Sequence, residues 1–269
     1  MITSKSTQAT EPKPILVVKL GGSMLDQLTE AFYESFIELQ KQYRCIIVHG
    51  GGPAITKLLN KLSIEGEFHN GLRKTNLETM EVVEMVLGGS VSSQITGNLT
   101  KQGIKAVGVK GSEASLLQAD YLDKENLGFV GKVLEVDATV LHQLLDQGYF
   151  PVVAPVGKTL DHETVNINAD VAAGAIARSV GAEKLLFVTD VPGILFDNEV
   201  MEETTPAEIE QLIEKGTIYG GMIPKVHSAI TALSDHLQEV RIVSGEQPLM
   251  EDGSLSGTSI RGKRKEKVE

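Results

Sequence analysis

The sequence predicts an α/β protein in which helices cover both faces of a mostly parallel central sheet, forming a three-layer αβα sandwich. Two observations predict this fold class. Short apolar runs alternate along the chain with segments that carry apolar residues at helical spacing. The short runs are apolar at nearly every position, which is typical of parallel strands buried on both faces.

The first half of the chain alternates strands and helices from its first apolar run onwards. Thr29 and Asp137 stand where helix caps are expected, and Pro53 suits the first turn of a helix. We expect Gly88 and Gly89 to loosen the longest helix. The predicted strands are Leu16–Leu20, Cys45–Val48, Ala106–Val109, Phe129–Val136 (as one or two short strands) and Tyr149–Val156. The predicted helices are Thr29–Arg44, Pro53–Leu62, Asn76–Lys101 and Asp137–Gly148, with a loop at Phe68–Thr75.

The second half repeats the alternation. Gly181 and Gly216 are placed to end helices, and Thr205 with Pro206 opens one. In a parallel sheet, ligands bind beyond the carboxyl ends of the strands, so we expect a site at that edge. The predicted helices are Val171–Val180, Thr205–Gly216 and Pro224–Leu237, and the predicted strands are Leu185–Val188 and Val240–Val243, followed by a glycine- and serine-containing loop.

Composition excludes several classes of protein. With 269 residues, 41% of them hydrophobic, the chain can build the core of one large domain or two lobes. Cys45 is the single cysteine and lies in an apolar run, so we expect an unreactive core thiol and no disulfide. A net charge of -11 and 4% aromatic residues argue against nucleic-acid binding. The sequence shows no membrane-spanning run and no apolar leader, so we expect a cytoplasmic protein.

We expect two lobes within one continuous fold. The most polar stretch near the middle of the chain, Asp161–Glu163, is the predicted boundary. The predicted divisions are an extended or disordered N-terminus at 1–14, an N-lobe at 15–163, a C-lobe at 164–260 and a short basic tail at 261–269.

Three apolar runs end alike, in polar residues and glycine. They are VVKLGG from Val17, IVHGGG from Ile47 and FVTDVPG from Phe187. Glycine lets backbone approach a ligand, free N–H groups cradle anions, and a helix N-terminus adds partial positive charge. A tight strand-to-helix turn is the alternative explanation of each. Three such ends in one chain, with Lys19 and His49 beside two of them, favour an anion site.

Common nucleotide and catalytic motifs do not explain these glycines. Gly157-Lys158-Thr159 resembles the end of a P-loop, but the position that needs its first glycine holds Val152. The sequence contains no G-x-G-x-x-G fingerprint, no H-E-x-x-H or Cys/His metal spacing, no G-x-S-x-G elbow and no protein-kinase signature. The expected anion site is therefore of another kind.

Six short motifs occur in a fixed order and together resemble the amino-acid kinase family. The similarity extends from about Ile15 to Ile260, nearly the whole chain, and is strongest to members that act on N-acetyl-L-glutamate. The resemblance implies the amino-acid kinase fold. The motifs are KLGGS (Lys19–Ser23), HGGGP (His49–Pro53), GLRKT (Gly71–Thr75), NINAD (Asn166–Asp170), TDVPGIL (Thr189–Leu195) and GGMIPK (Gly220–Lys225).

The resemblance also implies a reaction. ATP would phosphorylate the side-chain carboxylate of N-acetyl-L-glutamate, giving an acyl phosphate and ADP in arginine biosynthesis, with Mg²⁺ bridging the phosphates. A carboxylate must then approach a triphosphate, so the protein has to align the two and neutralise charge. By the same resemblance, the N-lobe binds the amino acid and forms a homodimer, and the C-lobe binds ATP.

Three residues acquire catalytic roles through the resemblance. Lys19 and Lys225 would reach the transferring phosphoryl group from opposite sides, and Asp170 would sit between the two ammonium groups. Each has a simpler alternative. Lys19 could be a strand-end lysine extending to water, Lys225 an exposed surface lysine, and Asp170 a helix N-cap, alone or in addition to its catalytic role.

Further residues acquire binding roles. Arg73 would fork onto a substrate carboxylate and Asn166 would hydrogen-bond the substrate, although an ordinary loop arginine and asparagine are the alternatives. Gly51 and Gly52 would offer backbone N–H groups to the substrate. The residues implied for the nucleotide and its phosphates are Gly21, Gly22, Asp190, Val191, Pro192, Gly193, Ile194, Leu195, Thr217, Gly220, Gly221 and Met222.

Departures from the family pattern affect regulation and specificity. Lys110–Glu113 differs from many relatives, which leaves fine substrate preference open there. Pro12 and Pro14 break any N-terminal helix of the kind found in arginine-inhibited members, and the segment before Gly257-Thr258 lacks their usual pattern. We therefore expect a homodimer that is insensitive to arginine.

Two other functions would be compatible with the same fold. A kinase for carrier-linked aminoadipate or glutamate would need a basic surface for an acidic carrier, and this acidic chain offers little outside its tail. A non-catalytic ligand sensor would be expected to lose Lys19, Lys225 or Asp170, and all three are present.

Overall fold

The structure, a computed structural model, describes residues 12–197 and 199–262. An eight-stranded sheet runs through it in the order β14-β18-β15-β11-β1-β2-β8-β5. The six strands from β15 to β5 pair in parallel, while β18 is antiparallel to β15. The strands are β1 (Ile15–Leu20), β2 (Arg44–His49), β5 (Ala106–Lys110), β8 (Phe150–Ala154), β11 (Lys184–Thr189), β14 (Glu203–Thr204), β15 (Glu239–Ser244) and β18 (Thr258–Arg261).

Helices cover both faces of this sheet, which confirms the three-layer αβα prediction. Alternate residues of β1 enter two separate cores: Val17 packs with α6 to α9, and Val18 packs with α1 to α4. The helices are α1 (Glu30–Gln42), α2 (Gly52–Lys61), α3 (Leu77–Met85), α4 (Ser92–Lys101), α5 (Lys124–Leu127), α6 (Thr139–Asp146), α7 (Ala169–Ser179), α8 (Pro206–Glu214) and α9 (Met222–Ala232). Lys19 shares the face of Val17, so the strand's alternation points it at the α7 layer.

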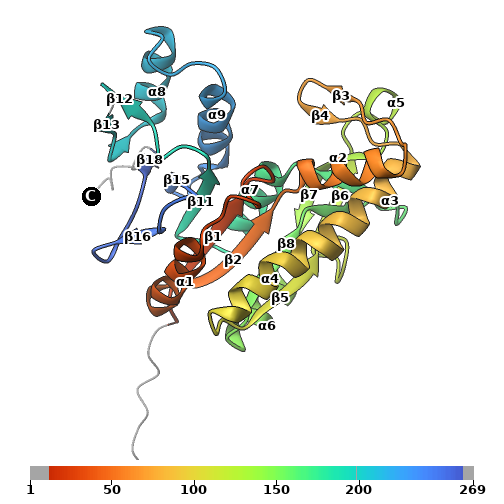
Figure 1. Cartoon of the computed structure of the whole chain (residues 1–269), viewed down its shortest axis with the longest axis horizontal. Coiled ribbons are helices and arrows are strands. Elements are labelled where there is room, and N and C mark those ends of the chain that lie inside the picture. The colour runs from red at the N-terminus through yellow and green to blue at the C-terminus, as the bar shows by residue number, and fades with distance from the viewer. Residues whose placement is uncertain (1–11, 198, 263–269) are drawn as a thin grey trace, which may run out of the picture.

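The elements gather into two groups around the central strands. Figure 1 shows α8, α9 and the hairpin of β12 (Leu195–Phe196) and β13 (Glu199–Val200) at one end of the molecule. The hairpin of β3 (Phe68–His69) and β4 (Leu72–Arg73) stands at the other end, near α2 and α5 (Figure 1). The segment expected to be a plain loop at 68–75 therefore contains a short antiparallel hairpin.

A second, smaller sheet closes on itself as a four-stranded barrel. Its strands are β6 (Leu117–Tyr121), β7 (Val130–Val136), β9 (Val156–Lys158) and β10 (Thr164–Ile167). The sequence analysis predicted β7 but neither β6 nor β10, because these two are short and interrupted by polar residues. The run Tyr149–Val156 is divided between β8 and β9, so the expectation of one strand there was wrong.

The predicted long helix from Asn76 to Lys101 is continuous in the structure but changes type midway. Asn76 caps α3 by accepting a hydrogen bond from the Thr79 N–H, and a π-helical segment, η1 (Val86–Val91), joins α3 to α4. A Cβ at Gly88 would lie 2.6 Å from the Lys110 side chain. Gly88 thus permits the close packing of the Lys110 side chain of β5 against the π-helical segment.

Chain ends and helix starts differ from the expectations in places. Arg261 belongs to β18 rather than to a tail, and α9 begins at Met222, two residues before Pro224. The remainder of the predicted tail, 263–269, and residues 1–11 of the predicted N-terminus lie outside the described residues. The hairpin of β16 (Met250–Glu251) and β17 (Ser254–Leu255) occupies the segment expected to be a loop.

Two further properties concern the described residues. Cys45 is buried and unpaired, and burial raises the pKa of its thiol far above the usual value, as an unreactive core cysteine requires. No helix in residues 12–197 and 199–262 is long and apolar enough to cross a bilayer.

Candidate functional site

The site is built where the direction of strand order reverses. From β1 the chain moves to β2 on one side of the sheet, and later returns to β11 on the other side. The carboxyl ends of these strands therefore open a crevice between them, the usual place for a ligand in such sheets. Gly21 follows β1 there, and its N–H bonds the Val188 carbonyl at 3.3 Å.

Two glycine turns meet in this crevice. A Cβ added to Gly22 would lie 2.5 Å from the backbone N of Gly51 and 2.8 Å from that of Gly52. A Cβ at Gly50 would approach the N of Gly22 at 3.0 Å. Only glycine allows the turns after β1 and β2 to touch through their backbones, so both present N–H groups to the same space.

Lys19, one residue before the end of β1, forms an ion pair. Its Nζ lies 2.6 Å from Oδ1 of Asp170, in the first turn of α7, and 6.0 Å from the centroid of the Phe187 ring. Asn168 is the N-cap of α7, its side chain accepting from the N–H groups of Asp170 and Val171. The alternative that Asp170 is itself the N-cap is therefore wrong. Its carboxylate is left free to meet the lysine.

Lys225 approaches from the opposite side. It lies in the first turn of α9 and its ammonium pairs with Asp190, directly after β11. Lys225 and the Thr189 hydroxyl hold the pKa of the Asp190 carboxyl below its usual range. Each lysine thus has its own carboxylate here, whereas the sequence analysis expected Asp170 to stand between both ammonium groups.

Both lysines line one cavity of about 450 Å³, the central cavity. Asp170, Gly21 and Gly22 line it as well, together with Ser228 of α9. The three residues predicted to be catalytic are therefore brought together. Of the cavities that share residues with this one, two contain most of the remaining predicted binding residues.

The first of these, the α2 cavity, has a volume of about 170 Å³ and shares Gly71, Leu72 and Asn168 with the central cavity. All four residues predicted to bind the acceptor substrate line it: Gly51, Gly52, Arg73 and Asn166. The residues that line it, all in the described part of the chain, include no Asp or Glu.

Arg73 is the main cation of the α2 cavity and is only 7% exposed. Its Nη2 donates to the Gly52 carbonyl at 3.1 Å and to Oγ1 of Thr56 at 2.8 Å, and its guanidinium lies over the ring of Phe68. Its buried Nη1 has no hydrogen-bond partner among the described residues. A buried, unpaired guanidinium N–H is costly, so this geometry favours an anionic ligand.

The second of these, the α9 cavity, has a volume of about 340 Å³ and shares Gly221 and Lys225 with the central cavity. Ile218 and Tyr219, which fall within the segment Thr217–Lys225 that the resemblance implies for the nucleotide, also line it. Pro192 and Gly220 were predicted to belong to the nucleotide site but do not line this cavity. The predicted residues that do are Asp190, Val191, Gly193, Ile194, Leu195, Thr217, Gly221 and Met222.

Three helix N-termini point into the connected cavities. Gly51 is the N-cap of α2, Asn168 that of α7 and Gly221 that of α9, and each lines at least one cavity. The partial positive charge of these helix ends favours anions. The two lysines and Arg73 add full charges. The arrangement suits two anionic ligands whose reactive ends meet in the central cavity.

A histidine acid or base and a cluster of metal-binding side chains are two other ways in which a site could act on phosphate. Burial lowers the pKa of His49 to about 4, so its ring is neutral near pH 7, and it lines none of the three cavities. No group of three or more His, Cys, Asp or Glu within the described ranges is arranged to hold a metal ion. The cationic and backbone N–H groups are therefore the main chemical resources of the site.

Comparison with known proteins identifies the family. The amino acid kinase family profile matches residues 14–244, most of the chain. The chain belongs to the amino acid kinase family. Among its relatives, an acetylglutamate kinase of Geobacillus kaustophilus is 50% identical to this chain over 247 residues. The matched residues cover 91% of this chain and 96% of that protein. An acetylglutamate kinase of Bacillus subtilis is 46% identical over 249 residues, covering 92% and 96%.

Solved structures agree on the fold of this family member. A crystal structure from Streptococcus mutans has a TM-score of 0.79 at 32% identity, covering 92% of this chain and 98% of that one. A carbamate kinase of Giardia lamblia, bound to AMP-PNP, has a TM-score of 0.67 at 18% identity, covering 93% and 99%. The amino-acid kinase fold predicted from the motifs is thereby confirmed.

Proposed function

We propose that this chain is an acetylglutamate kinase, transferring the γ-phosphoryl group of ATP to the side-chain carboxylate of N-acetyl-L-glutamate in arginine biosynthesis. One observation carries the proposal: Lys19 and Lys225, from opposite sides of the crevice, line the same cavity between two others. Two cations that converge on one point can neutralise the charge of a phosphoryl group moving between two anions.

The α2 cavity is the proposed acceptor site. The unpaired N–H of Arg73 would bind a carboxylate of the substrate, and the N–H groups of Gly51 and Gly52 would bind the second one. An ammonium group would find no acidic side chain there, whereas Leu87 and Val130 offer apolar contact to an acyl group. These features support an N-acylated amino acid over a free one.

The transfer step needs alignment more than covalent chemistry from the protein. A side-chain carboxylate oxygen forms a bond to the γ-phosphorus while the bond from that phosphorus to the bridging oxygen of ADP breaks. Lys19 would hold the equatorial oxygens from the acceptor side, over the Gly21-Gly22 turn, and Lys225 from the donor side. Asp170 keeps the ammonium of Lys19 oriented through their 2.6 Å contact.

The α9 cavity is the proposed nucleotide site. Its lining by the Asp190–Leu195 turn and by the first turn of α9 places it beside Lys225. We include Mg²⁺ in the proposal as an ion held mainly by the phosphate oxygens and water, since magnesium keeps several waters when it binds with substrate phosphates. All residues that line the α9 cavity follow the predicted lobe boundary near residue 163, whereas the α2 cavity takes residues from both sides of it, including Asn166.

The proposal is tested by measuring ADP release with N-acetylglutamate, glutamate, aspartate and aminoadipate as acceptors, each with and without hydroxylamine. We expect turnover with N-acetylglutamate and, in the hydroxylamine arm, a hydroxamate from the trapped acyl phosphate. Activity with free glutamate alone would contradict the proposal.

We also propose a homodimer that is insensitive to arginine, from the resemblance and the departures described above. Sedimentation should give a dimer mass, and millimolar arginine should leave turnover unchanged. A hexamer, or strong inhibition by arginine, would overturn this part. A cytoplasmic location remains a prediction of the sequence.

A further inference from the structure

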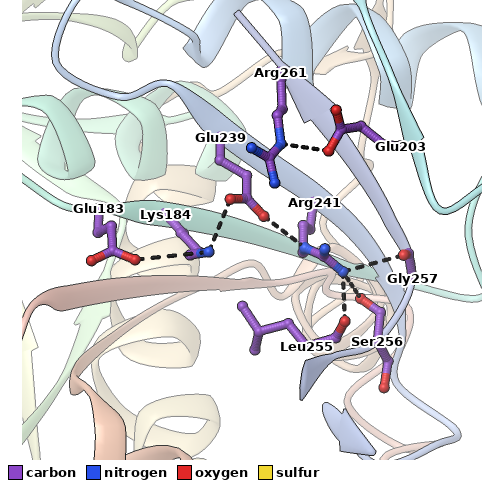
Figure 2. A network of polar contacts seen from close by, with 9 residues as sticks. All are labelled: Glu183, Lys184, Glu203, Glu239, Arg241, Leu255, Ser256, Gly257 and Arg261. Atoms are coloured by element: carbon purple, nitrogen blue, oxygen red, sulfur yellow. Dashed lines mark hydrogen bonds and ion pairs between the residues drawn. The ribbon is translucent and has the colours of Figure 1, made fainter. Parts of the chain in front are cut away.

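A network of charged side chains lies at the edge of the sheet opposite the cavities. Lys184 begins β11 and Glu239 begins β15, so both stand at the amino ends of their strands. Glu239 accepts from Lys184 Nζ at 2.9 Å and from Arg241 Nε at 2.8 Å (Figure 2). These side chains are largely buried, with Glu239 11% and Arg241 16% exposed. A buried polar network with its hydrogen bonds satisfied makes the backbone segments that it contacts more rigid.

Arg241 uses a second guanidinium nitrogen to hold a segment of backbone. Its Nη1 donates to the carbonyl oxygens of Leu255 at 2.5 Å, Ser256 at 3.0 Å and Gly257 at 3.3 Å (Figure 2). Three consecutive carbonyls on one guanidinium nitrogen fix the path of the chain as it leaves β17 and enters β18. Gly257 has a φ of +76°, and a Cβ there would lie 2.1 Å from the Ile242 carbonyl oxygen.

The fixed segment leads directly to the α9 cavity. Thr258 follows Gly257, is fully buried, and its Oγ1 accepts a hydrogen bond of 2.8 Å from the N–H of Ile194. A Cβ at Gly193 would lie 2.6 Å from the same Oγ1. The Gly193-Ile194 turn therefore rests on Thr258, and both of its residues line the α9 cavity.

We propose that Arg241 and Thr258 are positioning residues for the nucleotide: Arg241 fixes residues 255–257, and Thr258 transmits that position to the Gly193-Ile194 turn. This inference rests on the proposed function, in which the α9 cavity binds ATP. Neither side chain lines the central, α2 or α9 cavity. Their effect is thus on where the nucleotide turn lies, and the acceptor site at the other end of the molecule is outside their reach.

The test compares Arg241→Gln and Thr258→Val with the conservative Thr258→Ser. ADP affinity is measured by calorimetry without acceptor, and KM for ATP and for N-acetylglutamate by initial rates, well below each variant's melting temperature. We expect Arg241→Gln and Thr258→Val each to weaken ADP binding roughly tenfold, through a misplaced turn. KM for N-acetylglutamate should stay within about twofold. Thr258→Ser keeps the acceptor oxygen and should restore ADP affinity.

Arg261→Gln is the matched control, because Arg261 lies on the same strand as Thr258 and pairs with the exposed Glu203 (Figure 2). It should bind ADP like the wild type. The double variant Arg241→Gln/Thr258→Val should lose less than the sum of the two single losses, as expected for one connected path.

Unchanged ADP affinity in a folded Thr258→Val protein would overturn the inference, and so would an equal rise in both KM values. An equal loss in Arg261→Gln would also overturn it. If Arg241→Gln does not fold, the Thr258 pair decides alone. Failure of the wild type to phosphorylate N-acetylglutamate would instead contradict the proposed function, while the ADP titrations remain interpretable.

Discussion

The α2 cavity and the α9 cavity differ in how firmly their residues are held. In the α2 cavity, Arg73 is 7% exposed, is fixed by two hydrogen bonds and stacks on Phe68. In the α9 cavity, Leu195 is 43% and Tyr219 is 74% exposed, on a two-residue strand and on the segment before α9. The cation of the proposed acceptor site is therefore already held in place, whereas the exposed side chains of the proposed nucleotide site would be ordered by the ligand.

The difference suggests a division of binding energy between the two substrates. A preformed site binds with little loss of side-chain freedom, so a small acceptor can be held by few contacts. A large nucleotide has surface enough to order exposed side chains when it binds. Substitution of a buried side chain of the α2 cavity, such as Arg73, should thus affect folding stability together with acceptor binding. Substitution of an exposed side chain of the α9 cavity, such as Tyr219, should affect nucleotide binding with little change in folding stability.

Replacement of Lys225, at the border of the central and α9 cavities, should have the largest effect. Lys225→Ala removes a cation from the transferring phosphoryl group, so we expect kcat to fall about a hundredfold or more with the melting temperature nearly unchanged. Lys215→Ala, at an exposed position after α8, is the control and should keep full turnover. Near-normal turnover in Lys225→Ala would show that this lysine does not stabilise the transferring phosphoryl group.

Arg73→Gln tests the α2 cavity as the proposed site of the acceptor. Hydrogen bonds to charged groups contribute about 1.5–3 kcal/mol, so KM for N-acetylglutamate should rise roughly ten- to hundredfold while KM for ATP stays within about twofold. Arg44→Gln is the control, since Arg44 pairs with the exposed Asp146 away from the cavities. A larger rise in KM for ATP than for the acceptor would show that the two cavities are assigned the wrong way round.

Gly22→Ala and Gly52→Ala test the backbone contact between the two glycine turns, because one position is crowded and the other is open. A Cβ at Gly22 meets backbone at 2.5 Å, while a Cβ at Gly52 meets nothing within 4 Å. We expect Gly22→Ala to destabilise folding by about 1–3 kcal/mol and Gly52→Ala to be nearly neutral, as measured by urea unfolding. Equal losses in the two variants would contradict the contact between the glycine turns.

Tyr219→Ala should have the smallest effect. Its exposed side chain lines the α9 cavity, so we expect KM for ATP to rise a few-fold, with unfolding free energy changed by less than about 0.5 kcal/mol. Tyr149→Ala, which is 40% exposed before β8, is a matched control for loss of a surface tyrosine. A substantial loss of stability in Tyr219→Ala would show that this side chain of the α9 cavity is held as firmly as Arg73 in the α2 cavity.

The sequence predicted the central strands and most helix starts, because their signals are local. Continuous apolar runs marked β1, β2, β11 and β15, and Thr29, Asn76 and Thr205 cap helices where expected. It missed β6 and β10, whose pairing depends on barrel closure rather than on their own pattern. Two-residue strands such as β3 and β4 carry no periodicity that a sequence could reveal.

For the site, residues that share a motif were easier to find than pairs that join distant motifs. Lys19, Asp170 and Lys225 were identified through their motifs, and the structure places them on one cavity. The pairing of Lys225 with Asp190 joins two motifs 35 residues apart and could not be read from either. Asn168 as the cap of α7 was within reach, since asparagine is a preferred N-cap and stands directly before the helix.

The π-helical segment η1 holds about one residue more than an α-helical path between α3 and α4 would need. Its Leu87 packs where a Cβ on Gly51 would lie 2.6 Å away, so this segment sets one wall of the α2 cavity. Loss of one residue there would convert the wide turn to an ordinary α-helical one, and α3 and α4 would keep their relative facing because the extra residue of a π turn is taken up locally. The buried faces of Val83 and Ile95 would then still meet the same core. A single-codon deletion between 86 and 91 should therefore spare the fold and shift the cavity wall that Leu87 forms.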